Sequence, residues 1–232
     1  MLNIENILIS WEDLPEEMKN DKVKMYYDIL DKKRSSLVIK RVFDIVVSLF
    51  LIVVLLPVFA IIAYMIKKDS KGPVIFRQTR VTAYNRDFTI YKFRTMVNDA
   101  DSLGSSVTVQ GDSRITAVGN KLRKYRLDEL PQLVNVLFGD MSFVGTRPEV
   151  RKYVDQYSQS MMATLLMPAG ITSEASIAYK DEDELLKNAF DCDYVYVNKI
   201  LPEKMKYNLR SIRKFSIERD ILTMIKTVIS VI

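Results

Sequence analysis

The longest uncharged stretch of the chain runs from Ile45 to Ile66 and is interrupted only by Ser48, Pro57 and Tyr64. A helix of this length would measure about 33 Å, enough to cross a hydrocarbon core of roughly 30 Å. The stretch follows a charged leader and begins too far from the first residue to be a cleaved signal peptide. The pattern therefore predicts a helix that associates with a membrane.

The flanks of this stretch indicate how it meets the membrane. Pro57 lies just past the middle, where proline removes a backbone hydrogen bond and bends a helix. Basic residues stand at both ends, Lys40–Arg41 before and Lys67–Lys68 after, and such residues favour the cytoplasmic side. A helix that enters, bends and returns to the same face keeps both flanks there, whereas a straight crossing keeps only one. The sequence thus favours a re-entrant membrane helix. Labelling of cysteines at positions 36 and 70 in intact cells would test it.

Beyond the membrane helix the pattern changes. Two segments alternate apolar and polar residues, Val74–Arg80 and Phe88–Arg94, which predicts a β-hairpin. Later segments are predicted as helices at 119–127, 130–137, 150–167 and 181–188, as a loop at 99–119 and as irregular structure at 138–148. The predicted fold class is α+β and mostly helical: a re-entrant membrane helix, a small β-hairpin and amphipathic interfacial helices in one compact domain on the cytoplasmic face.

This reading divides the chain into three parts. Residues 1–36 form an N-terminal appendage whose role the sequence does not give, residues 37–70 form the membrane helix, and residues 71–232 form the main domain with a helical C-terminus. The C-terminal helix carries an apolar face made of Phe215, Ile217, Ile221, Leu222, Met224, Ile225, Val228 and Ile229. This face either packs on the domain or lies at the bilayer interface, and packing is favoured.

Composition narrows the chemistry. The chain has a net charge of +5 and a pI of about 9.1, so it prefers anionic partners such as nucleic acid, phosphate-bearing ligands or an anionic membrane. It has no histidine, which removes the commonest general base, and one cysteine, which excludes a zinc cluster or a disulfide framework. Catalysis would therefore fall on carboxylates, lysines, tyrosines or hydroxyls.

Asp128 and Glu129 are the candidates that this elimination leaves. They are adjacent, and four basic residues precede them closely: Lys121, Arg123, Lys124 and Arg126. The simpler alternative is a solvated helix start with mixed charges. The local sequence does not decide between these two interpretations.

Six segments resemble a known family when they are taken in order. They are Lys40–Asp44, Gly72–Gln78, Tyr91–Met96, Gly111–Thr116, Arg126–Leu133 and Asn135–Pro148. Together they resemble the bacterial sugar transferases, small monotopic phosphoglycosyl transferases, over residues 38 to 180. The resemblance implies an enzyme on the cytoplasmic face of the bacterial inner membrane. Such an enzyme transfers a sugar-1-phosphate from a UDP-sugar to a polyprenol phosphate, releases UMP and initiates glycoconjugate synthesis.

The chain departs from the family pattern in two places. The family's Gly-Pro-Arg-Pro reads Gly145-Thr146-Arg147-Pro148 here, which keeps the arginine. The usual Pro-Gly-Ile-Thr-Gly is replaced by the segment Pro168–Ser173. These departures bear on the sugar that is preferred more than on the chemistry.

The resemblance also implies roles for individual residues. Asp128 would be the nucleophile and a contact for Mg²⁺, and Glu129 would be the general base. Asp140 is a candidate second metal ligand. The substrate-binding candidates are the cations Lys92, Arg94, Arg123 and Arg147. For each of these cations taken alone, a solvated or lipid-facing side chain is the competing interpretation.

Two other classes of protein remain as alternatives. A membrane-anchored nucleic-acid-binding protein would fit the pI, but the sequence has no recognisable helix-turn-helix or single-strand-binding signature, and we expect no nucleic-acid partner. A catalytically silent scaffold of a glycan-assembly complex would fit the membrane helix. UMP release from UDP-sugars discriminates between the enzyme and both alternatives. The sequence leaves the sugar, the glycan and a homodimer open.

Overall fold

The bent apolar helix pair is the longest feature of the fold, which comes from a computed structural model that describes residues 7–98, 100, 112–186 and 190–231. Helix α2 (Arg34–Val54) and helix α3 (Leu56–Asp69) meet at Leu55. Pro57 lies in the first turn of α3, where its missing N–H has no helical partner to lose. Among the described helices none alone is long and apolar enough to cross a bilayer. The two together meet that test by length and composition, with a bend of 61° between them.

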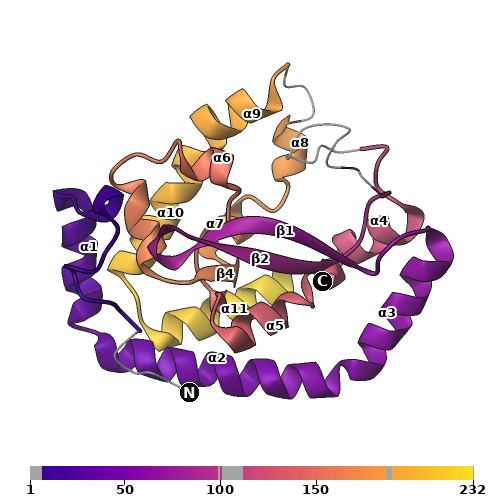
Figure 1. Ribbon diagram of the computed structural model, residues 1–232, viewed down its shortest axis with the longest axis horizontal. Coiled ribbons are helices and arrows are strands. Elements are labelled where there is room, and N and C mark those ends of the chain that lie inside the picture. The colour runs from indigo at the N-terminus through magenta and orange to yellow at the C-terminus, as the bar shows by residue number, and fades with distance from the viewer. Residues whose placement is uncertain (1–6, 99, 101–111, 187–189, 232) are drawn as a thin grey trace.

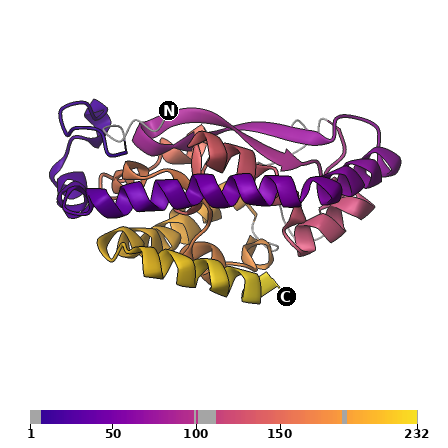
Figure 2. The same cartoon turned by 90° about the horizontal axis from the view of Figure 1, so that it is seen from below.

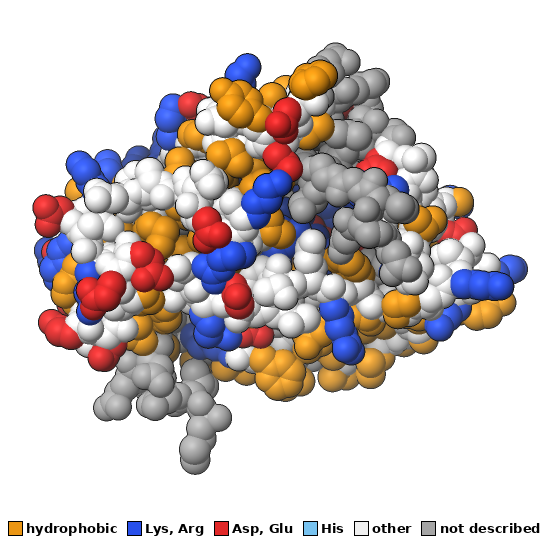
Figure 3. Space-filling model, turned by 45° about the horizontal axis from the view of Figure 1, so that its top comes forward, with side chains coloured by type: hydrophobic (Ala, Val, Ile, Leu, Met, Phe, Trp, Pro, Cys, Tyr) orange, Lys and Arg blue, Asp and Glu red, His pale blue; other side chains and the backbone are white. Residues whose placement is uncertain are grey.

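Both helices expose apolar side chains along their length. The exposed residues are Ile39, Val42, Val46, Leu49, Phe50, Val53, Val54, Leu56, Ile61 and Tyr64. Apolar side chains gather along the lower edge of the molecule in Figure 3, where α2 runs in Figure 1. An exposed apolar surface of this extent is typical of a membrane or protein contact.

The basic residues at the start of the membrane segment contact protein. Arg41 donates to the carbonyl oxygens of Val136 and Leu137, at 2.6 and 2.8 Å, at the end of helix α5 (Gln132–Phe138). Lys40 pairs with Asp220 at 2.6 Å, on helix α11 (Ile217–Val231). Figure 2 shows α11 running beside α2. These two contacts join the membrane helix to the rest of the fold.

The predicted β-hairpin is confirmed. Strands β1 (Ile75–Thr82) and β2 (Arg86–Phe93) pair antiparallel, with Ile75 opposite Phe93. The short turn between them, Ala83–Asn85, holds Tyr84 and Asn85 at positive φ. The buried residues of β2, among them Phe88 and Ile90, pack against α5.

A second sheet was not predicted. Strand β3 (Met141–Val144) pairs in parallel with β4 (Ala169–Thr172), so the prediction of irregular structure at 138–148 is wrong. All four residues of β3 are buried, and a strand covered on both faces lacks the alternation that reveals a half-exposed one. Just after β3 and just before β4, the two backbones approach each other closely. A Cβ on Gly145 would lie 2.5 Å from the Pro168 carbonyl oxygen.

The predicted continuous helix at 150–167 is also wrong. The segment forms helix α6 (Arg151–Val154) and, after a turn, a 3-10 helix at Met161–Leu166. Five consecutive residues of the 3-10 helix, 162–166, are buried. An amphipathic α-helix buries only one face. Because this segment is packed on all sides, its structure follows from tertiary contacts and not from the local hydrophobic pattern.

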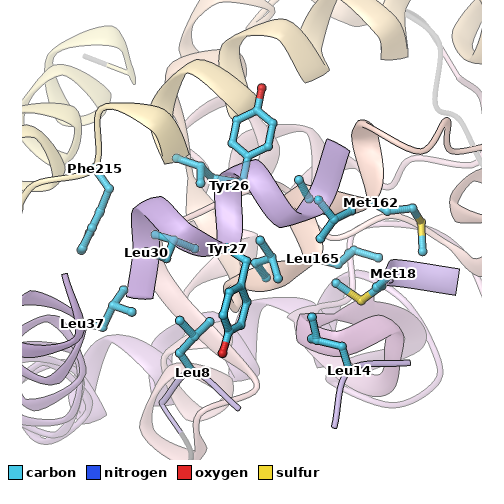
Figure 4. Packing of buried hydrophobic residues seen from close by; sticks show 14 of the residues in the cluster. Leu8, Leu14, Met18, Tyr26, Tyr27, Leu30, Leu37, Met162, Leu165 and Phe215 are labelled. Atoms are coloured by element: carbon cyan, nitrogen blue, oxygen red, sulfur yellow. The ribbon is translucent and has the colours of Figure 1, made fainter. Parts of the chain in front are cut away.

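The N-terminal segment belongs to the main core. A 3-10 turn (Glu16–Met18) leads into helix α1 (Asp21–Asp31), whose start is capped by the Asn20 side chain. The apolar residues of this segment are Leu8, Leu14, Met18, Val23, Tyr26, Tyr27 and Leu30, and they form one cluster with Leu37, Met162, Leu165, Leu166 and Phe215 (Figure 4). The predicted boundary after residue 36 falls inside the first turn of α2.

Short helices complete the fold. Helix α4 (Ala117–Lys124) and a 3-10 turn (Leu127–Glu129) precede α5. Most of the predicted loop at 99–119 lies outside the described residues. The C-terminal part contains α7 (Glu174–Ala178), α8 (Glu182–Leu186), α9 (Cys192–Val195), a π-helical turn (Tyr196–Ile200) and α10 (Leu201–Arg213). The predicted helix at 181–188 corresponds to α8, and its last two positions lie outside the described residues.

Helix α11 divides its apolar face between two environments. Met224 packs against the core, together with buried Thr223. The residues Ile221, Leu222, Ile225, Val228 and Ile229 are exposed. Packing alone, the favoured interpretation of the sequence, therefore accounts for only part of this face.

Candidate functional site

The adjacent carboxyl groups lie on the short turn between α4 and α5. Arg126 precedes this turn in the left-handed region, at φ 51°, and its carbonyl oxygen accepts from the Glu129 N–H at 3.2 Å. Asp128 is 8% exposed and Glu129 is 6% exposed. A solvated helix start, the competing interpretation of the sequence, is therefore wrong. Burial of two adjacent carboxyl groups is costly and needs compensating charge.

That compensation is concentrated on Glu129. Three cations converge on its Oε1 atom: Arg147 at 2.9 Å, Lys92 at 3.6 Å and Arg126 at 3.9 Å. Burial by itself raises the pKa of Glu129, but the charges of Arg147, Lys92 and Arg126 outweigh burial and lower that pKa to about 2. Glu129 is thus held ionised.

Asp128 has the opposite environment. Within the described residues its carboxylate takes part in no ion pair within 4.0 Å and in no hydrogen bond. Burial raises the pKa of Asp128, and the charge of Glu129 raises it further, against weaker opposing effects of Lys92, Arg123 and Arg147. Two neighbouring carboxyl groups with divergent environments are a recognised sign of different chemical roles.

Lys92 reaches the pair from strand β2. Asn135 of α5 fixes this strand, because its Oδ1 accepts from the Tyr91 N–H at 3.1 Å and its Nδ2 donates to the Thr89 carbonyl oxygen at 2.8 Å. Its side chain therefore binds the backbone of β2 as a third strand would. Burial and then the charge of Arg147 lower the pKa of Lys92 to about 8.

Arg147 reaches the pair from the other side. It follows β3 by three residues, beyond the point where Gly145 and Gly170 bring the two parallel strands together. Its Nη2 donates to Glu129, and the charge of Glu129 raises the pKa of this guanidinium above its usual value. The parallel sheet and the hairpin thus deliver one cation each to the same carboxylate.

The other predicted site residues lie in different contacts. Arg123 acts on Asp128 through its charge, which partly offsets the rise in the pKa of Asp128 caused by burial and Glu129. Arg94 is 5% exposed and donates to the carbonyl oxygens of Ser70 and Lys71, each at 2.8 Å, so it fastens the turn after α3. Asp140 pairs with Arg86 at 2.9 Å, near the tip of the hairpin.

Two contributors were not selected from the sequence. The sequence shows Arg126 as a basic residue two positions before Asp128, but gives no signal that it contacts Glu129. Asn135 was part of a matching segment but had no assigned role. Its function depends on the edge of β2, which is a partner that no local pattern reveals.

The carboxylates could also contribute to a magnesium site. The described part of the chain contains no group of three or more His, Cys, Asp or Glu side chains placed to hold a metal ion. Mg²⁺ is commonly bound through one or two carboxylates together with the phosphates of a substrate. Asp128 fits such a site, because no cation of the described ranges pairs with its carboxylate oxygens.

Comparisons with known proteins point to one family. A family model described as bacterial sugar transferase matches residues 35–232. The chain is 38% identical over 193 residues to the UDP-N-acetylgalactosamine-undecaprenyl-phosphate N-acetylgalactosaminephosphotransferase of Aeromonas hydrophila, which covers 82% of this chain and 43% of that relative. It is 36% identical over 195 residues to the UDP-glucose:undecaprenyl-phosphate glucose-1-phosphate transferase of Escherichia coli (strain K12). The aligned residues are 82% of this chain and 39% of that relative.

For a shorter relative, the aligned residues make up a larger share of that protein's length. An uncharacterized sugar transferase of Bacillus subtilis (strain 168) is 34% identical over 162 residues, which are 70% of this chain and 79% of that protein. The chain therefore spans less than half of the two longer relatives and most of the shorter one. Residues 7–33 precede the match to the family model.

Proposed function

Because the chain belongs to the bacterial sugar transferase family, we propose that it transfers a sugar-1-phosphate from a UDP-sugar to undecaprenyl phosphate and releases UMP. The relatives from Aeromonas hydrophila and Escherichia coli are named for transfers of this kind. The lipid-linked product would start the synthesis of a bacterial capsule, O-antigen, exopolysaccharide or glycoprotein glycan. One observation carries the proposal: among the described residues no cation pairs with the buried Asp128, whereas three surround its neighbour Glu129.

In the first step a carboxylate oxygen of Asp128 attacks the phosphorus that carries the sugar. An oxygen–phosphorus bond forms, the bond from that phosphorus to the bridging oxygen breaks, and UMP leaves with the bonding electrons. The phosphosugar remains on Asp128 as an acyl phosphate, an established form of covalent catalysis. The unpaired carboxylate and its raised pKa support this role, because a more basic oxygen is a better nucleophile.

In the second step an oxygen of the polyprenol phosphate attacks the same phosphorus. The bond between phosphorus and Asp128 breaks and the carboxylate is restored. The product is a polyprenyl diphosphate sugar. Two displacements at phosphorus, with Asp128 holding the phosphosugar between them, thus replace a single direct transfer between two anions.

The surrounding cations would bind the phosphoryl oxygens. Lys92, Arg126 and Arg147 already lie around one carboxylate oxygen, so they do not have to be assembled when substrate arrives. Preorganised donors of this kind often supply the largest contribution to catalysis of group transfer. The planar guanidinium of Arg147 suits bidentate binding of phosphate, and Arg123 would act on the side of Asp128.

Glu129 has one role in the free protein and another during turnover. A carboxyl group with a pKa of about 2 is a weak base, so in the free protein Glu129 mainly holds its three cations together. Movement of Arg147 onto a phosphate would remove the strongest of these charges and raise the pKa of Glu129. Its predicted function as general base would then apply to the complex with substrate.

Magnesium would be held by Asp128 together with phosphate oxygens, and when bound it would offset the charge of the diphosphate. The chain's own cations offset part of the same charge.

The protein would lie on the cytoplasmic face of the bacterial inner membrane as a monotopic protein. The exposed apolar surface of α2 and α3 and the bend between them support this placement.

Replacement of the nucleophile tests the proposal directly. Asp128→Asn should abolish both UMP release and the phosphosugar adduct on the protein, whereas Asp155→Asn, at an exposed carboxylate after α6, should leave both unchanged. The measurement is a screen of UDP-sugars for UMP release, with mass spectrometry of the trapped adduct. An adduct on the Asp128→Asn variant would remove Asp128 from this role. Salt-dependent retention on DNA without UMP release would favour a nucleic-acid-binding protein, and inactivity with every UDP-sugar would favour a scaffold.

A further inference from the structure

Gln132 buries a hydrogen-bond donor that has no partner. It is the first residue of α5 and is 1% exposed. Its Nε2 atom makes no hydrogen bond in the described part of the chain. An unsatisfied buried donor costs about 1–3 kcal/mol, and such atoms are rare in folded proteins.

Two other buried side-chain polar atoms lack a partner within the described residues, and both have local explanations. The Arg94 Nε atom belongs to a guanidinium that already donates to Ser70 and Lys71. The hydroxyl of Ser142 lies beside the buried carboxyl group of Asp44. For the Gln132 amide nitrogen, the described residues offer no hydrogen-bond acceptor.

The position of Gln132 relates it to the nucleophile. The backbone from Leu127 through α5 follows helical turns, with Leu130 N–H donating to the Leu127 carbonyl at 3.3 Å. Residues three and four positions apart share a face of such a segment. Gln132 therefore lies about one turn after the carboxyl pair, four residues from Asp128 and three from Glu129, and Asn135, about one turn further on, contacts β2.

The two buried amide side chains of α5 differ in their hydrogen bonds. Asn135 uses its oxygen and its nitrogen in hydrogen bonds with the backbone of β2. Gln132, one turn closer to the nucleophile, leaves its nitrogen unused. An amide stays neutral at all relevant pH values and can only donate or accept hydrogen bonds. Its missing partner is therefore an acceptor, and a phosphoryl group on Asp128 would bring three oxygens to this place.

We propose that Gln132 is a substrate-binding residue whose Nε2 donates a hydrogen bond to an oxygen of the phosphoryl group that is transferred to Asp128. This role rests on the proposed function. The donor is buried before the reaction, and the cations Lys92 and Arg147 lie at Glu129, three residues before it. Loss of one preorganised donor of this kind lowers the rate by about 10²–10³.

The test is Gln132→Met, which keeps the length of the side chain and removes the amide. Adduct formation from a UDP-sugar should slow by about 10², while the melting temperature should stay the same or rise because an unsatisfied donor has gone. The matched control is Asn135→Met, which removes two satisfied hydrogen bonds and should lower the melting temperature. UMP lacks the transferred phosphoryl group, so Gln132→Met should bind UMP as the unchanged protein does.

Several results would overturn the role of Gln132. One is that Gln132→Met forms the adduct at the rate of the unchanged protein. Another is that Gln132→Met loses UMP affinity by the same factor as its rate of adduct formation, which would indicate general damage to the site. If Gln132→Met does not fold, Gln132→Glu replaces it, and an unaltered rate in that variant would overturn the role as well. An unchanged protein that forms no adduct with any UDP-sugar would instead refute the proposed function.

Discussion

Asp128 and Glu129 are neighbours in sequence, yet the fold gives them opposite properties. Three cations delivered by β2, by the segment after β3 and by the left-handed Arg126 surround Glu129. None pairs with Asp128 in the described residues. Chemical identity alone would make the two carboxyls interchangeable, so their roles come from their surroundings.

The ion pairs of Glu129 should make stability depend on pH in a defined direction. The folded pKa, about 2, lies below the usual 4.5. The contribution of Glu129 is therefore fully present above about pH 4.5 and is lost as the pH falls through 2. Glu129→Gln should melt below the unchanged protein at pH 7, and this gap should narrow below pH 4.5. Glu16→Gln, at an exposed surface pair with Lys19, should produce almost no gap. A gap for Glu129→Gln that stays constant from pH 7 to pH 3 would contradict the prediction.

Lys92 should set the alkaline limit of activity. Its pKa is lowered to about 8, so it loses its charge as the pH rises through that value. A neutral lysine binds phosphate less well, and kcat/KM, which reports on the free enzyme, should fall above pH 8. Lys92→Arg should move this limb to higher pH because arginine keeps its charge. Lys68→Arg, at an exposed position on α3, should leave the limb in place. A limb unchanged by Lys92→Arg would assign it to another group.

At the scale of elements, the two sheets position the cations. The hairpin carries Lys92, and its distance from α5 is set by Asn135. The parallel pair β3–β4 leads into Arg147, and its two glycines allow the backbones to approach. Each sheet is small, but each ends at the same carboxylate.

Widening the parallel pair should therefore displace Arg147. In Gly145→Ala the new Cβ would lie 2.5 Å from the Pro168 carbonyl oxygen, and overpacking of this kind costs about 1–3 kcal/mol. We expect a lower melting temperature and slower UMP release. Thr146→Ala, at the next residue, adds no atom and should retain the stability of the unchanged protein. A Gly145→Ala protein with normal stability and rate would mean that the strands separate without consequence for the site.

The elements that the sequence predicted are those with local signals. Alternation identified the hairpin, and an uncharged run with Pro57 identified the bent helix pair. The strand at Met141–Val144 escaped because burial on both faces erases alternation. The carboxyl pair and the cations Lys92 and Arg147 could be named in advance. The left-handed turn at Arg126 and the link through Asn135 could not, because each is defined by partners distant in sequence or by tertiary packing.

At the scale of the whole molecule, residues 7–33 pack into a hydrophobic core that they share with the main domain. They supply seven of the sixteen buried residues of this core, which pack against the segment 161–166 and Phe215 (Figure 4). The match to the family model begins at residue 35. A core built across that boundary was not expected from a charged leader without a strong hydrophobic period.

Substitutions in α1 can test this unity. Leu30 is fully buried, and Leu30→Ala should cost about 2–5 kcal/mol of unfolding free energy. Met25, on the same helix, is 45% exposed, and Met25→Ala should cost little. Both are measured by thermal unfolding of the full chain in detergent, monitored through the main domain. A transition of the main domain that ignores Leu30→Ala would show that the N-terminal segment unfolds independently.

The bent pair of α2 and α3 has a consequence for kinetics under the proposed function. Of the two substrates, the nucleotide sugar is dissolved in water and the polyprenol phosphate is confined to a lipid sheet. The concentration that governs the second step is then a surface density, expressed per area of membrane. Adding inert phospholipid at fixed total acceptor would dilute the acceptor in two dimensions and slow the second displacement, while the first displacement continues undiminished. The adduct on Asp128 would accumulate as the membrane is expanded.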